Sequence, residues 1–78
     1  MFFLRRVSMI ISNRQMQILT FIDDYIQEYG YSPTVREIRD GVGLYSSSTV
    51  HNHISILKEK GYIEKVESAP RTIRVLKK

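Results

Sequence analysis

The hydrophobic residues of this chain first recur at helical spacing between residues 13 and 29. Ser12 and Gln15 form a capping box just before this pattern, because each side chain can accept a hydrogen bond from the other residue's backbone N–H. Gly30 follows as a stop, since glycine tolerates the left-handed conformation that ends many helices. The pattern predicts a core helix from about Asn13 to Tyr29. Its apolar face consists of Ile18, Leu19, Ile22, Tyr25, Ile26 and Tyr29.

A shorter helical pattern begins after Pro33. Thr34 and Glu37 form a second capping box, so this helix should start at Thr34, and Gly43 ends it after about two turns. Gly41 lies inside the helix and costs roughly 1 kcal/mol relative to alanine. We therefore expect either close packing at Gly41 or a loose helix. The apolar stripe consists of Val35, Ile38 and Val42.

A third helix is predicted after the consecutive hydroxyl residues 46–49, whose oxygens are good N-caps. It should begin near Ser46 or Ser47 and stop at Gly61. At about 100° per residue it has one apolar and one polar side, and taken alone such a helix is often only a solvated surface helix. The apolar side consists of Val50, Ile54 and Leu57. The polar side consists of Ser48, Asn52, Ser55 and Glu59, flanked by Thr49 and His51.

The second and third helices are joined by the glycine-bearing turn 43–45, with Leu44 expected to plug into the core. Two short capped helices joined in this way make a helix-turn-helix. After Gly61 the apolar residues alternate, which predicts two strands of about five residues around the turn-rich stretch 67–71. The predicted fold is mainly α with a small β-hairpin: a winged helix-turn-helix of three helices and a two-stranded wing, with Arg71 near the tip of the wing.

Length and composition fit one small domain and no second one. The chain has 78 residues, of which 42% are hydrophobic, and this length supports only a thin core. We expect the domain to span residues 12–78, after an N-terminal extension (1–11) that is either flexible or precedes a true start at Met9. The chain's beginning lacks the order of a secretory signal, and no stretch approaches the roughly 18 apolar residues of a membrane span. A cytoplasmic protein is expected.

Metal, cofactor and catalytic sites are not predicted. The chain has no cysteine, and its only imidazoles, His51 and His53, are too few for a metal site. His51 near Ser47 or Ser48 has no acid to orient it, so we expect no enzyme. We also expect no cofactor and no small-molecule ligand.

The polar side of the third helix indicates a DNA contact, because Asn, Ser, Thr and His match the donors and acceptors on base edges in the major groove. The formal charge of +4 suits a polyanionic partner, although such an excess is also common in proteins that bind nothing acidic. The alternative is a protein-interaction winged helix that modulates another regulator, but a surface for a protein partner should be more apolar. For Arg71, the alternative to a DNA contact is a solvated charge.

Two runs in this chain are distinctive: Pro33-Thr34-Val35-Arg36-Glu37-Ile38 and Ser46-Ser47-Ser48-Thr49-Val50-His51. With them, the stretch from Ser12 to Leu76 resembles the N-terminal winged-helix DNA-binding domain of the LexA repressors, in particular the form found in Gram-positive bacteria. The resemblance implies a sequence-specific, double-stranded DNA-binding transcriptional regulator, repressor-like and connected with the SOS response. Further matching runs are Ser12-Asn13-Arg14-Gln15, Ile18-Leu19, Gly30-Tyr31-Ser32, Val42-Gly43-Leu44, Lys60-Gly61 and Pro70-Arg71.

The resemblance also implies which residues contact DNA, because the family places the N-terminal half of the third helix in the major groove and the wing on the phosphate backbone. Asn52 stands where the Gram-positive pattern usually has Gly, so operator preference should differ there. Gly41 stands where Ala is usual. The implied base contacts are Ser47, Ser48, Thr49, His51 and Asn52. The implied phosphate contacts are Thr34, Arg36, Ser46 and Arg71.

LexA repressors continue into a C-terminal self-cleaving serine peptidase domain that dimerises, and this chain has no residues for it. We expect either a stand-alone regulator, of the kind a phage or mobile element encodes, or a fragment. Because a single such module binds weakly, a homodimer on a palindromic operator is expected. Candidate dimer contacts are Phe2-Phe3-Leu4 and Ile56, although a singly exposed aliphatic residue needs no such role.

Overall fold

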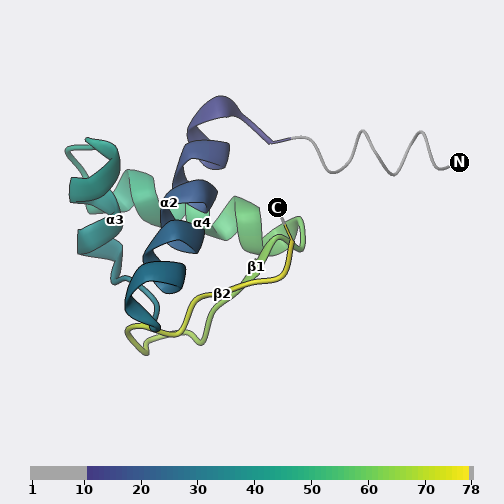
Figure 1. The fold of residues 1–78 in the computed structure, drawn as a ribbon. Coiled ribbons are helices and arrows are strands. Elements are labelled where there is room, and N and C mark those ends of the chain that lie inside the picture. Colours follow the sequence, from purple (N-terminus) through teal and green to yellow (C-terminus); the bar gives the residue numbers. More distant parts are fainter. Residues whose placement is uncertain (1–10, 78) are drawn as a thin grey trace, which may run out of the picture.

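The computed structural model describes residues 11–77, and these form three helices followed by a two-stranded antiparallel hairpin. The order and type of these elements confirm the predicted winged helix-turn-helix (Figure 1). The candidate dimer contact at Phe2-Phe3-Leu4 lies outside the described residues, and so does the predicted extension except for Ile11. The elements are α2 (Asn13–Tyr29), α3 (Val35–Val42), α4 (Ser47–Glu59), β1 (Ile63–Glu64) and β2 (Arg74–Val75).

Both predicted capping boxes are present. At α2, the Gln15 N–H donates to Ser12 Oγ at 3.1 Å and the Ser12 N–H donates to Gln15 Oε1 at 3.0 Å. At α3, Thr34 and Glu37 make the equivalent pair of bonds at 3.1 and 2.9 Å. Each box satisfies two N–H groups that have no partner within the helix, which explains why the helix starts match the sequence prediction.

Helix α4 begins at a serine cap and ends just before a glycine. Ser46 is the N-cap, and its Oγ accepts from the Ser48 N–H at 3.1 Å without a reciprocal bond. The last helical residue is Glu59, and Gly61 follows with a φ of 83°, a value that favours glycine. The predicted stop at Gly61 is therefore confirmed to within two residues.

The core lies where the three helices and the hairpin meet. Its helical members come from the predicted apolar stripes, its remaining members come from the hairpin, and Leu44 packs against them from the turn as expected. Ile56 is partly buried. The buried hydrophobic residues are Ile18, Leu19, Ile22, Ile38, Val42, Val50, Ile54, Leu57, Tyr62, Ile63 and Ile73.

The predicted apolar face of α2 is not buried at its C-terminal end. Tyr29 is 52% exposed, and its ring lies 4.5 Å from that of Tyr25, centroid to centroid. Tyr31, also half exposed, lies 6.0 Å from Tyr25. These tyrosines form a surface cluster beside the connector to α3 instead of entering the core.

Gly41 is closely packed. A Cβ atom at this position would lie 2.2 Å from Cε1 of Phe21, so the ring occupies the space a side chain would need. Of the two sequence-based alternatives, close packing is therefore correct.

The hairpin strands are shorter than the predicted five residues: each has two, paired as Ile63 with Val75 and Glu64 with Arg74. Beyond these two pairs, side-chain hydrogen bonds replace the backbone hydrogen bonds of the sheet. Thr72 Oγ1 accepts from the Val66 N–H and donates to the Ala69 carbonyl. Pro70, in the same stretch, has no N–H to donate. Local turn chemistry thus outweighs β propensity.

The hairpin lies beside α2 and carries its turn toward the connector between α2 and α3 (Figure 1). No helix within residues 11–77 is long and apolar enough to cross a membrane.

Candidate nucleic-acid interface

The N-terminal half of α4 presents a polar surface to solvent. Ser48, Thr49, His51 and Asn52 are all exposed and are called the α4 polar face below. They point outward because Val50, Ile54 and Leu57, on the opposite side of the helix, are at most 3% exposed. The helix is therefore packed on the core through its apolar side, and the α4 polar face is turned to solvent.

An open groove of about 520 Å³ lies beside this face, between the start of α3, the start of α4 and the wing. It brings together residues that the sequence places in separate segments. Three of the predicted phosphate contacts and two of the predicted base contacts line it. These are Thr34, Arg36 and Arg71 with Ser47 and His51.

The remaining predicted residues lie on α4 outside this groove. Ser48, Thr49 and Asn52 belong to the α4 polar face, and Ser46 caps the helix. Ser47 is partly buried, and its Oγ accepts from Arg39 Nη1 at 3.4 Å. Thr34 Oγ1 accepts the capping bond of α3. The hydroxyl oxygens of Thr34 and Ser46 thus already accept capping hydrogen bonds within the protein.

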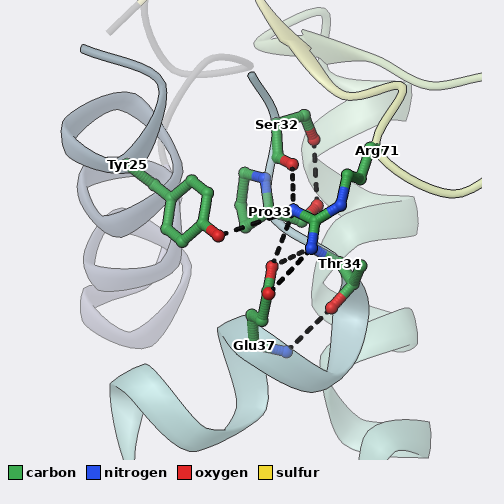
Figure 2. Close-up of polar contacts among 6 residues, drawn as sticks. All are labelled: Tyr25, Ser32, Pro33, Thr34, Glu37 and Arg71. Carbon is green, nitrogen blue, oxygen red and sulfur yellow. Dashed lines mark hydrogen bonds and ion pairs between the residues drawn. The ribbon is translucent and has the colours of Figure 1, made fainter. Parts of the chain in front are cut away.

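Arg71 differs most from the sequence-based expectation of a free side chain near the wing tip. Its guanidinium makes a bidentate pair with Glu37, at 3.1 Å to Oε1 and 2.9 Å to Oε2. It also donates to the Ser32 carbonyl at 3.0 Å and lies 4.9 Å from the centre of the Tyr31 ring. Figure 2 shows the guanidinium enclosed between Ser32, Glu37 and the hydroxyl of Tyr25. We call this set of contacts the Arg71 node.

The Arg71 node has electrostatic and structural consequences. Hydrogen bonds from Arg71, and secondarily from the Thr34 backbone, lower the pKa of Glu37 to about 2. The adjacent Ser32 is buried, and its Oγ accepts from the Ile73 N–H at 3.2 Å. The wing is therefore joined to the α2–α3 connector by both a charged and a neutral contact. Arg71 is therefore not the solvated charge of the alternative interpretation, and its contact with a DNA phosphate stays a prediction.

Three polar residues make contacts that the sequence did not predict. Lys65 lines the same groove as Arg36, which no pattern along the chain indicates because the two lie on distant segments. Arg14 Nη1 donates to the Val42 carbonyl at 3.0 Å, so it satisfies the C-terminal end of α3. Gln15, only 7% exposed, places its Nε2 3.3 Å from Nδ1 of His53 on α4.

Within residues 11–77, no group of three or more candidate metal ligands occurs. The two histidines have separate environments, since His51 faces the groove and His53 faces Gln15. The groove itself offers cations and hydroxyls, a set suited to an anionic partner.

Comparison with known proteins identifies close relatives of this domain. The family model for the LexA DNA binding domain matches residues 9–72. The LexA repressor of Desulfitobacterium hafniense (strain Y51) is 53% identical over 66 residues, and that of Bacillus cereus (strain Q1) is 54% identical over 66 residues. Each match covers 85% of this chain and 32% of the relative. The chain thus spans about a third of the length of these repressors.

Proposed function

The chain belongs to the LexA DNA-binding domain family, and on this basis we propose that it is a sequence-specific, double-stranded DNA-binding transcriptional repressor. The observation that carries the proposal is the α4 polar face, which lies beside a groove lined by Arg36 and Lys65. We place α4 in the major groove, where Ser47, Ser48, Thr49, His51 and Asn52 contact base edges.

The wing and the helix starts act on the phosphate backbone in this proposal. Arg36 is exposed at the first turn of α3, where the free N–H groups of a helix also favour an anion. Phosphate contacts supply affinity and orientation, whereas the α4 polar face supplies the choice of site. Because its proposed ligand is bacterial DNA, we place the protein in the cytoplasm.

Two copies on a palindrome are part of the proposal. One module of this size buries only about 600–1,000 Å² against DNA, which gives weak binding by itself. Two-fold symmetric half-sites, one helical turn or a multiple apart, let two copies bind together.

A role as a protein-interaction module is less well supported. Interfaces for protein partners are enriched in aromatic and apolar side chains at their centre. The α4 polar face has none of these among its exposed members.

Selection of bound sequences from a pool of random duplexes tests the proposal. We expect an enriched, palindromic motif, with gel bands that correspond to one and two bound copies. Thr49→Ala should blur the motif at particular base pairs, whereas Gln27→Ala, on the solvated side of α2, should leave it unchanged. If the unmodified chain enriched no motif, recognition of bases by α4 would be abandoned.

A further inference from the structure

Three cationic side chains line the groove beside α4, and they are not equivalent. Arg36 projects from the first turn of α3, Lys65 follows β1, and Arg71 comes from the returning arm of the hairpin. Whether each can bind a phosphate depends on what its charged group already contacts.

Arg71 is already paired within the protein, although its side chain is 39% exposed. Its Nη1 donates to Glu37 Oε1, the Ser32 carbonyl and the Tyr25 hydroxyl, and its Nη2 donates to Glu37 Oε2. A phosphate that took over this guanidinium would leave the Glu37 carboxylate without its partner and next to a second anion. Like charges at such close range repel, so the exchange is unfavourable.

The charged groups of Arg36 and Lys65, in contrast to that of Arg71, have no hydrogen-bonded partner within residues 11–77. Within residues 11–77, neither side chain makes a hydrogen bond or an ion pair within 4 Å; the charge of Lys65 acts only at longer range, where it adds to the effect of Lys58 in lowering the pKa of Glu67. Arg36 is exposed, and Lys65 is partly buried, which leaves its ammonium at the end of a stem that packs on the protein. Both charged groups are available to a ligand in the groove.

We propose that Lys65 is the phosphate-binding cation of the wing, that it binds backbone phosphate together with Arg36, and that Arg71 is a positioning residue for this pair. This inference rests on the proposed function, which supplies the DNA backbone as the ligand. It assigns to Lys65 the contact that the sequence assigned to Arg71.

The connection between the three residues runs through Glu37. Glu37 caps α3 through Thr34 and binds Arg71 with the same carboxylate (Figure 2). Arg36 is the preceding residue on the same helical turn, so the wing is anchored to the turn that carries Arg36. Breaking the Arg71 node should let Lys65 move relative to Arg36 without removing either charge.

Salt dependence of duplex binding tests the role of Lys65. Each phosphate contact contributes a slope of about 0.9 in a plot of log affinity against log salt concentration. We expect Lys65→Ala and Arg36→Ala each to lose about 0.9 of slope, so between 50 and 200 mM salt their affinity should fall about 3.5-fold less than that of the unmodified chain. Lys65→Arg should keep the slope. Arg74→Ala, which removes an equal charge from the hairpin outside this groove, should also keep it.

Arg71→Lys tests the positioning role, because it keeps the charge and the same positive φ but loses the planar fork. We expect Arg71→Lys to bind DNA as weakly as Arg71→Ala, and the Ile73 amide, which donates to Ser32, to exchange faster with solvent in both variants. Arg71→Lys with unmodified affinity, or Lys65→Ala with an unchanged slope, would overturn the inference.

The failure of this inference is distinguishable from that of the proposed function. If the unmodified chain selects a motif but Lys65→Ala keeps the full slope, only the assignment of Lys65 is wrong. If the unmodified chain binds no duplex, the proposed function fails and the Lys65 contact with it. Hydrogen exchange at Ile73 needs no DNA, so unchanged exchange in Arg71→Lys refutes the positioning role in either case.

Discussion

Gly41→Ala should destabilise the protein, although the same change in an unobstructed helix stabilises it. Replacing glycine by alanine in a helix interior normally contributes about 1 kcal/mol to stability. Here the new Cβ would lie 2.2 Å from Cε1 and 2.4 Å from Cζ of Phe21, so the ring must move. Insertion of a methyl group into a packed site costs about 1–3 kcal/mol. The expected net effect is a loss of about 1 kcal/mol.

Thermal and urea unfolding of four proteins measure this effect: the unmodified chain, Gly41→Ala, Phe21→Ala and the double variant. A loss of about 1 kcal/mol lowers Tm by about 4–8 °C in a domain of this size. In the Phe21→Ala background the clash is absent, so Gly41→Ala should instead stabilise by about 1 kcal/mol. The coupling between the two positions is then about 2 kcal/mol. Stabilisation by Gly41→Ala with Phe21 present would refute the reasoning.

Three further predictions concern the interface and its supports. Asn52→Gly should shift the selected DNA motif at the base pairs nearest Asn52, because it removes an exposed amide from the α4 polar face. The pKa of Glu37 is about 2 in the folded protein, whereas its ordinary value is 4.5. The ion pair between Glu37 and Arg71 therefore stabilises the wing fully above pH 4.5, and this stabilisation is lost as the pH falls from about 4.5 to about 2. NMR signals of the wing should titrate in that window, and Glu37→Gln should remove the transition. Gln15→Ala should cost about 1–3 kcal/mol in thermal unfolding, because it leaves the Ser12 N–H and His53 without their partner.

Each of these has a result that contradicts it. An unchanged motif for Asn52→Gly would mean that Asn52 contacts no base. A wing transition that persists in Glu37→Gln would have to come from another carboxyl group. For Gln15→Ala, an effect no larger than that of the exposed control Gln27→Ala would show that the buried amide contributes little.

Local signals determined the helices of this protein. The capping boxes at Ser12 and Thr34, and the glycines at positions 30 and 43, involve residues within one or two turns of each other. The apolar stripes of the three helices are periodic, so their buried faces follow from the same short windows. For this reason the fold class and the helix bounds agree with the sequence prediction.

The hairpin shows where such local reasoning fails. Its residues have the β-forming character of longer strands, but the bonds of Thr72 and the position of Pro70 end the ladder after two pairs. Tyr29 has the correct helical phase for the core, yet no element within residues 11–77 covers it. Helical phase predicts the direction of a side chain, whereas burial depends on what packs against it.

The sequence by itself determined that this chain forms a winged helix with a polar face on its third helix, because caps, glycines and periodicity act over a few residues. Only the tertiary structure decided how the charges are used. Arg71 meets Glu37 and Ser32 across more than thirty positions of sequence, and Lys65 lines the same groove as Arg36, which lies on a separate segment. Which arginine is bound internally and which cation is available to DNA depends on these long-range contacts, and no local pattern encodes them.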